Sequence, residues 1–287
     1  MALVSSTPML QKARDNGFCI AAFNIHTLEM MQAVVEAAEE NEAPVILQTT
    51  VGTVKHLGID YIAASAKVAA KKAKIPVALH LDHCQDYELI LQCMRAGYTS
   101  VMIDASMYSF EENVKRTREV VKAAKALEVN VEAELGKIGG VEDEITVDEA
   151  DAHLADPEDC RKFVELTEVD TLAPAIGTAH GLYQGEPRID FDRIEEIARL
   201  VSIPLVLHGG SGIPVERVKR CVSLGIAKMN VATELRNAFS ASIKQAFLEN
   251  PGELDPRRYM KTAKEAVKRL AAEKMRICGS IGKGKSL

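Results

Sequence analysis

The chain alternates short apolar runs with longer amphipathic segments. Eight runs rich in Val, Ile, Leu and Ala are candidate strands: 19–25, 44–50, 76–83, 100–106, 130–136, 171–180, 204–210 and 228–234. Their nearly continuous hydrophobicity is typical of parallel strands that are covered on both faces. Between the runs, apolar residues recur at helical spacing beneath a charged face, which predicts helices. Examples of these predicted helices are 30–41, 110–127 and 191–201.

Eight strand–helix alternations favour a (β/α)8 TIM barrel, because an open doubly wound sheet fits the pattern less well once the count reaches eight. A length of 287 residues, 47% of them hydrophobic, suits one closed core, so we expect a single domain over 1–287. The segment 250–287 predicts an additional C-terminal helix. The stretch 137–156 exceeds ordinary loop length and contains Gly139-Gly140 as a hinge, so it is a candidate active-site lid.

Composition and charge narrow the possible ligands. A net charge of −6 and a pI near 5.7 argue against nucleic-acid binding, which needs surplus Lys and Arg. The opening segment lacks the apolar core of a signal peptide, and no apolar run reaches about eighteen residues, so we expect a cytoplasmic protein with no membrane contact. The six cysteines are scattered along the chain, and we interpret them as reduced thiols.

Ionisable residues stand near the carboxyl end of most predicted strands, the face on which barrel active sites are built. Neutral imidazoles suit Zn²⁺, and three protein ligands leave a coordination position open for substrate. A single strand-end histidine is more often structural, but His83, His180 and His208 occur at comparable strand ends, which favours a metal site. Asp104 and Glu134 are either hydrogen-bond acceptors at the rim or groups beside a second cation.

Glycine-rich turns suggest an anion site in the same mouth. The run HGGSGIP (208–214) follows the seventh predicted strand, and GTAHG (177–181) and NVATE (230–234) add further backbone and hydroxyl donors. Such a turn can be an ordinary tight connection. Its position after the seventh strand, where barrels commonly bind phosphate, favours phosphate binding.

The strings VALHLDH, VEAELGKIGGVEDE, GTAHGLY, LVLHGGSGIP and NVATE resemble, in order and spacing, the class II fructose/tagatose-bisphosphate aldolases, over essentially the whole chain. The resemblance implies reversible, zinc-dependent cleavage of fructose or tagatose 1,6-bisphosphate to dihydroxyacetone phosphate and glyceraldehyde 3-phosphate. It implies zinc ligation by His83, His180 and His208, with Asp104 and Glu134 near a second divalent position. It also implies a monovalent cation, Na⁺ or K⁺, beside the bound phosphate.

The same resemblance assigns Asp82 as the acid/base aspartate, and Glu142 in the 137–156 loop as the residue that moves the proton on the dihydroxyacetone-phosphate carbon. The candidate substrate contacts are Asn24, Gln48, Thr50, Gly181, Gly209, Gly210, Ser211, Asn230, Ala232 and Thr233. One of Arg257, Arg258 or Lys261 should reach the second phosphate, in the same or a neighbouring subunit. Family members are usually dimers or tetramers, and some relatives work with a companion subunit.

Signals for the sugar epimer conflict. Tagatose-specific members typically have two histidines after the aspartate, whereas this chain has His83 followed by Cys84. The GGSG turn is similar to the fructose members, yet NVATE and GTVKH are similar to the tagatose members. Ala232 stands where many fructose enzymes have Asp or Asn. Both substrates therefore remain open.

Two rival functions are a Schiff-base aldolase and a catalytically silent companion subunit. A Schiff-base aldolase needs a buried strand lysine, but Lys228 is expected at the wrong end of the eighth strand and Lys137 in a solvated loop. A catalytically silent companion subunit is the other rival, since fold does not fix function. The presence of all three histidines together with Asp82 and Glu142 argues against loss of chemistry.

Overall fold

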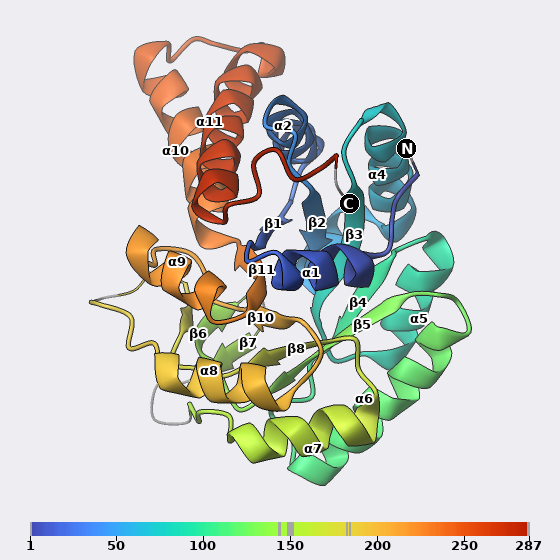
Figure 1. Cartoon of the computed structure of the whole chain (residues 1–287). Helices are drawn as coiled ribbons and strands as arrows, with labels where there is room; N and C mark the ends of the chain where they lie inside the picture. Colours follow the sequence, from blue (N-terminus) through green and yellow to red (C-terminus); the bar gives the residue numbers. More distant parts are fainter. Residues whose placement is uncertain (1, 143–144, 148–151, 182, 184, 286–287) are drawn as a thin grey trace.

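The barrel predicted from the sequence is confirmed. The structure is a computed structural model that describes residues 2–285 apart from 143–144, 148–151, 182 and 184. Eight parallel strands close in the order β1-β11-β10-β8-β5-β4-β3-β2 (Figure 1). The barrel strands are β1 Ile20–Asn24, β2 Val45–Thr49, β3 Val77–Cys84, β4 Ser100–Ile103, β5 Asn130–Leu135, β8 Thr171–Pro174, β10 Leu205–Leu207 and β11 Ile226–Val231. Each predicted run overlaps one of them, although β3 ends one residue later and β11 begins two residues earlier than predicted.

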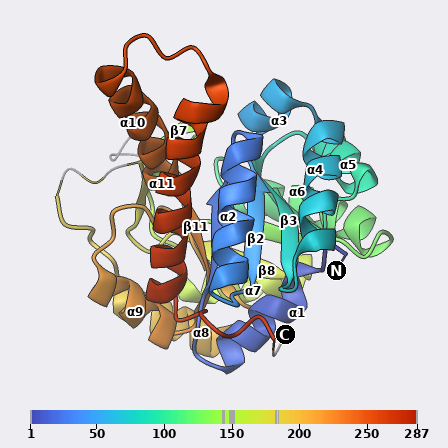
Figure 2. The same ribbon diagram turned by 90° about the horizontal axis from the view of Figure 1, so that it is seen from above.

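Helices surround this barrel, as Figures 1 and 2 show. They are α1 Ser6–Asp15, α2 Leu28–Glu40, α3 Val51–Leu57, α4 Ile59–Lys72, α5 Tyr87–Ala96, α6 Phe110–Lys125, α7 Pro157–Thr167, α8 Phe191–Leu200, α9 Val215–Ser223, α10 Thr233–Glu249 and α11 Pro256–Ile277. Helix α1 closes the amino end of the barrel, where Met9 and Leu10 pack on Ile20 and Ala227. In the part of the chain that the structure describes, no helix is long and apolar enough to cross a membrane.

Local signals explain how a helix supports the mouth of the barrel, and α6 is an example. The Ser109 side chain accepts a hydrogen bond from the Glu112 N–H at the start of this helix, which is a standard N-cap. On the buried face, the Asn113 amide donates to the backbone carbonyl of Glu134 at 2.9 Å. The helix therefore anchors the end of β5, where a candidate site residue lies.

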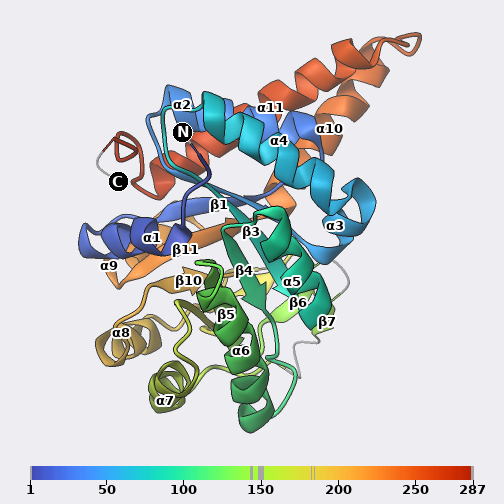
Figure 3. The ribbon, with the colours of Figure 1, turned by 90° about the vertical axis from the view of Figure 1, so that its right-hand side faces the viewer.

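Helices α10 and α11 pack against each other and project beyond the barrel, as the side view in Figure 3 shows. Only Thr233 and Leu235 are buried among the 17 residues of α10. Helix α11 also packs along α2, which attaches this α10–α11 arm to the barrel. The predicted C-terminal helix is thus confirmed as α11.

The sixth predicted strand, 171–180, was wrong in its second half. Strand β8 ends at Pro174, and His180 lies instead on the short strand β9 Ala179–His180. Gly177 allows the chain to turn between them, with a φ of +90° and the carbonyl oxygen of Arg188 only 2.1 Å from where a Cβ would stand. A left-handed residue pressed against backbone requires glycine. The sixth-strand histidine therefore reaches the mouth from a loop.

The segment 137–156 is more regular than the predicted loop. It contains the antiparallel pair β6 Gly139–Glu142 and β7 Ile145–Val147, and Lys137 bridges to His153 below them. Strand β6 also pairs with β9, which forms a second sheet in the order β7-β6-β9. A Cβ on Gly140 would lie 2.2 Å from the carbonyl oxygen of His180, so glycine lets this hairpin approach the histidine.

Candidate active site at the carboxyl end of the barrel

Three histidine rings meet at the mouth. The ring centroids of His83 and His180 are 4.9 Å apart, and those of His83 and His208 are 4.6 Å apart. One side-chain nitrogen from each residue lies within 4.8 Å of the others. Among the described residues, the buried Nε2 atoms of His83 and His180 have no hydrogen-bond partner. Buried polar atoms are normally satisfied, so two convergent orphan nitrogens fit a metal cation.

The conformation of His83 is unusual and supports this arrangement. Its φ is +47°, in the left-handed region that non-glycine residues rarely adopt, and the β3–β4 pairing shifts register between Leu81 and Cys84. The Nδ1 atom lies 2.8 Å from Asp104 Oδ2, which leaves Nε2 for another partner. Burial opposes ionisation of Asp104, but the hydrogen bond with His83 holds the pKa of this carboxyl well below its usual value.

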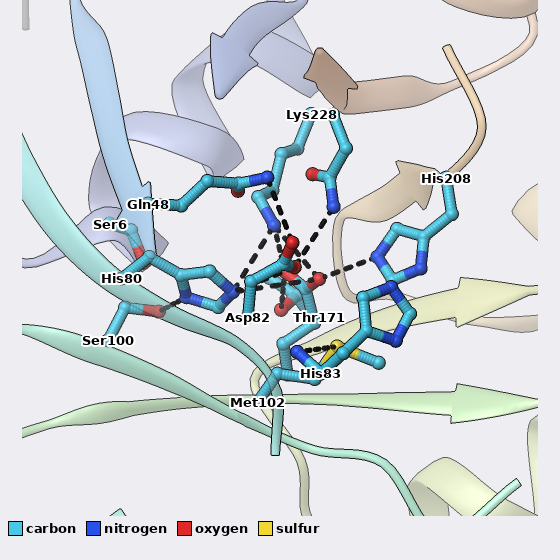
Figure 4. Close-up of polar contacts among 12 residues, drawn as sticks. Ser6, Gln48, His80, Asp82, His83, Ser100, Met102, Thr171, His208 and Lys228 are labelled. Carbon is cyan, nitrogen blue, oxygen red and sulfur yellow. Dashed lines mark hydrogen bonds and ion pairs between the residues drawn. The ribbon is translucent and has the colours of Figure 1, made fainter. Parts of the chain in front are cut away.

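Asp82 adjoins the histidine cluster and is held by three amide groups. Asn24 and Gln48 donate to its Oδ2 at 2.9 and 3.2 Å, and Asn230 donates to its Oδ1 at 3.1 Å. The side chain is buried, which would raise its pKa, yet the neighbouring His83 charge lowers the pKa of Asp82 below the usual value. The result is an oriented, ionised carboxylate beside the histidines. Figure 4 shows these contacts with Gln48 and the neighbouring rings.

A second buried cluster lies deeper inside the barrel, toward its amino end, and the sequence prediction missed it. Lys228 Nζ lies 2.9 and 2.8 Å from the two oxygens of Glu132 and 3.4 Å from His80 Nε2 (Figure 4). Burial and the Lys228 charge lower the pKa of His80 to about 3. Lys228 lies in the amino half of β11, as expected, but its buried side chain runs inside the barrel to Glu132 and His80, a contact that the sequence analysis did not foresee.

A strand-period signal could have found this cluster. Side chains two residues apart on a strand point to the same face. The pairs His80/Asp82, Glu132/Glu134 and Lys228/Asn230 all have this spacing, on β3, β5 and β11. Asp82, Glu134 and Asn230 therefore each have a polar residue one layer deeper in the barrel.

Glu134 faces His208 from the opposite side, with its Oε2 3.1 Å from His208 Nδ1. Burial and the Asp104 charge raise the pKa of Glu134. With His83, these two carboxylates form another group whose ligand atoms lie within 4.8 Å of one another. A second divalent position at Asp104 and Glu134 stays a prediction.

The predicted phosphate contacts also come together. One small hollow is lined by His180, Gly181, Gly209, Gly210, Ser211, Asn230, Ala232 and Thr233. A Cβ on Gly209 would lie 2.3 Å from the carbonyl oxygen of Ala179, and one on Gly210 would lie 2.5 Å from that of Asn230. Only glycine fits there. The hollow adjoins the start of α10, whose N-cap residue Ala232 has no side-chain oxygen to bond the first N–H groups. Those N–H groups are suited to an anion.

Several predicted contacts are not in these clusters. Thr50 begins α3, where its hydroxyl accepts from the Thr53 N–H. The basic residues Arg257, Arg258 and Lys261 lie at the start of α11, toward the outer end of the α10–α11 arm in Figure 3. The backbone of Glu142 belongs to β6, but its side chain lies outside the described part of the chain.

Comparison with known proteins shows the family. Residues 4–283 match the family model of class II fructose-bisphosphate aldolases. The YdjI aldolase from Escherichia coli K12 is a similar solved structure, with 35% identity, a TM-score of 0.87, and coverage of 98% of this chain and 99% of that one. The chain therefore belongs to the class II fructose-bisphosphate aldolase family, a family of carbon–carbon lyases.

Two further structures are similar. A putative fructose-1,6-bisphosphate aldolase from Coccidioides immitis has 32% identity and a TM-score of 0.88, with 98% of each chain covered. Fructose-bisphosphate aldolase from Campylobacter jejuni has 24% identity and a TM-score of 0.85, with 98% of this chain and 97% of that chain covered, and supports the fold alone.

Proposed function

We propose that the chain is a zinc-dependent ketose-1,6-bisphosphate aldolase. It would reversibly cleave fructose or tagatose 1,6-bisphosphate to dihydroxyacetone phosphate and glyceraldehyde 3-phosphate. One observation carries the proposal: the orphan buried nitrogens of His83 and His180 converge with His208 beside the ionised Asp82. Family membership supports the same reaction class.

His83, His180 and His208 would hold the zinc ion, with a coordination position left for substrate. When bound, the ion would supply stabilisation of the negative charge left on the three-carbon fragment. The buried carboxylate of Asp104 hydrogen-bonds to His83 Nδ1 and would fix the orientation of that ring.

Asp82 would act as the general base that takes the proton from the carbon-4 hydroxyl. Its two oxygens accept from Asn24, Gln48 and Asn230, so the carboxylate cannot rotate freely and its remaining lone pairs have a fixed direction. Asn24 and Gln48 would therefore serve the substrate by orienting Asp82. Glu142 would move the proton at carbon 3, which requires the 137–156 segment to act as a lid.

The glycine hollow would bind the phosphate of the dihydroxyacetone-phosphate half through backbone N–H groups and the Ser211 hydroxyl. A monovalent cation beside this phosphate would need backbone carbonyls near His180 and Gly209. The second phosphate would be bound by a basic residue among Arg257, Arg258 and Lys261. Because α10 buries so little of its surface within this chain, we propose a homodimer or homotetramer in which the arm of one subunit serves its neighbour.

The rival functions gain no support from the contacts. A Schiff-base mechanism needs a free amine, whereas the Lys228 ammonium is paired with both oxygens of buried Glu132. A silent companion subunit has no need for an oriented Asp82 or for convergent histidine nitrogens.

The proposal is tested by coupled assays of zinc-loaded protein with fructose and tagatose 1,6-bisphosphate in parallel. We expect triose-phosphate release from at least one substrate, and the ratio of the two kcat/KM values identifies the preferred epimer. Absence of triose phosphate from both substrates, with zinc bound, would contradict the proposed reaction.

A further inference from the structure

A buried ammonium occupies a position in the barrel that has the ligands of a cation site. His80, Asp82 and Glu132 offer ligand atoms within 4.8 Å of one another, and all three side chains are buried. Lys228 Nζ lies 2.8 Å from Glu132 Oε2 and 3.4 Å from His80 Nε2. The lysine charge therefore stands among groups that could otherwise ligate a cation.

The ion pair fixes Glu132 in place. Its two oxygens lie 2.9 and 2.8 Å from Lys228 Nζ, and both side chains are 1% exposed. The same Oε1 also lies 3.0 Å from His208 Nε2. An ionised carboxylate only accepts hydrogen bonds, so this contact requires a proton on Nε2.

The other ring nitrogen of His208, Nδ1, faces Glu134, which is held less firmly than Glu132. His208 Nδ1 lies 3.1 Å from Glu134 Oε2, but a neutral imidazole carries only one proton and cannot donate to both glutamates. Glu134 has no lysine partner among its described contacts, whereas Lys228 Nζ holds both oxygens of Glu132. The single ring proton of His208 should therefore lie on Nε2, where it is donated to the fixed carboxylate of Glu132.

We propose that the Lys228–Glu132 ion pair is a positioning device which orients His208 and keeps its proton on Nε2, so that Nδ1 is presented to the metal. This inference rests on the proposed metal-dependent function. Neither residue touches the substrate in this account. Lys228 acts through Glu132, and Glu132 acts through the imidazole, as outer partners of metal-ligating histidines commonly do.

The test measures zinc affinity by competition with a chromophoric chelator. Lys228→Met keeps the length of the side chain but leaves Glu132 as an uncompensated buried charge, without the partner that fixes its position beside His208. We expect zinc binding to weaken by about 10- to 100-fold. Arg14→Met is the matched control, because Arg14 is a partly buried cation at the amino end of the barrel that donates to the carbonyls of Ile203 and Val201. It should lower the Tm without changing zinc affinity.

A double variant separates charge from packing. In Lys228→Met/Glu132→Gln, the uncompensated charge is gone and the Gln carbonyl can still accept from Nε2–H. We expect this double variant to bind zinc more tightly than Lys228→Met alone. The zinc-loaded wild type should also show the His208 ring proton on Nε2 in ¹⁵N-detected NMR, a measurement that needs no variant.

The outcomes are distinct. Wild-type zinc affinity in Lys228→Met, a double variant no tighter than the single one, or a His208 proton on Nδ1 would each overturn the inference while leaving the proposed function intact. Failure of the wild type to bind zinc at all would instead contradict the proposed function.

Discussion

The two halves of the mouth are built from different parts of the chain. The metal half consists of side chains: three histidines and Asp82, of which His83, His208 and Asp82 are oriented by buried partners. The phosphate half consists mainly of backbone, because Gly209 and Gly210 pass too close to neighbouring carbonyl oxygens for any side chain. Metal binding should be lost when side-chain atoms are removed from the first half. Phosphate binding should be lost when side-chain atoms are added to the second half.

This difference has a physical origin. A divalent cation needs a few strong ligands of defined type, and only particular side chains provide them. A phosphate presents several acceptor oxygens at its surface, and backbone N–H groups satisfy them wherever the chain can come close enough. Predictions that remove a ligand should therefore give larger effects than those that crowd the hollow.

The largest effect is expected for His180→Ala. The Nε2 atom of His180 has no partner among the described residues, so the variant removes a candidate ligand without breaking a hydrogen bond of that atom. We expect zinc to be lost and cleavage to fall to background. His56→Ala is the control, since His56 lies exposed near the end of α3. Retention of full zinc content and activity in His180→Ala would contradict the assignment of His180 as a zinc ligand.

Cleavage and proton exchange, measured separately, should distinguish the roles of Asp82 and Glu142. Asp82→Ala should lower kcat by about 10²-fold or more, the scale of losing a general acid/base, with zinc retained. It should spare exchange of the dihydroxyacetone-phosphate proton with solvent, because that step needs no carbon-4 hydroxyl. Glu142→Ala should reduce both cleavage and exchange. The exchange is followed by NMR in heavy water, and wild-type exchange in Glu142→Ala would assign the step to another base.

An intermediate effect is expected for Gly209→Ala. Gly209 and Gly17 have nearly equal φ values of +66° and +65°, but an added Cβ meets the Ala179 carbonyl at 2.3 Å only at Gly209. Both variants carry the left-handed penalty of about 1 kcal/mol, so Gly17→Ala isolates it. The clash should add roughly 2 kcal/mol and lower kcat/KM by about 30-fold, measured by steady-state kinetics. Equal kinetics for the two variants would show that the hollow tolerates a side chain.

The smallest effect is expected for Ser211→Ala. Its hydroxyl is one donor among several, and among the described residues it accepts only a long 3.4 Å hydrogen bond from the Glu234 N–H. Loss of one such hydrogen bond, worth about 1 kcal/mol, should raise KM by roughly 5-fold with kcat almost unchanged. A collapse of kcat would show that the hydroxyl acts in the chemistry.

The sequence predicted most of the barrel because each strand is a short apolar run, and these runs are easily separated from amphipathic helices. It missed the break after Pro174, since the turn at Gly177 depends on a contact with Arg188 that lies eleven positions away. It also missed the hairpin in 137–156, whose strand β6 pairs with distant His180. Such non-local pairing leaves little trace in hydrophobic periodicity.

The site was predictable where residue type decides the chemistry, as for the histidines and Asp82. The sequence analysis missed the deeper cluster, although its residues stand two positions before Asp82, Glu134 and Asn230, because the place of a residue along a strand does not show how far its side chain reaches inside the barrel. The role of Asn24 and Gln48 also needed coordinates, since only the structure shows that both amides bind the same Asp82 oxygen.

The most direct test of the central claim is removal and return of the metal. Protein dialysed against EDTA should lose cleavage of the preferred ketose bisphosphate, and stoichiometric Zn²⁺ or Co²⁺ should restore it. Borohydride treatment in the presence of substrate should leave the mass of the protein unchanged. Full activity in protein shown to be free of metal, or a substrate adduct trapped on a lysine such as Lys228, would contradict the account.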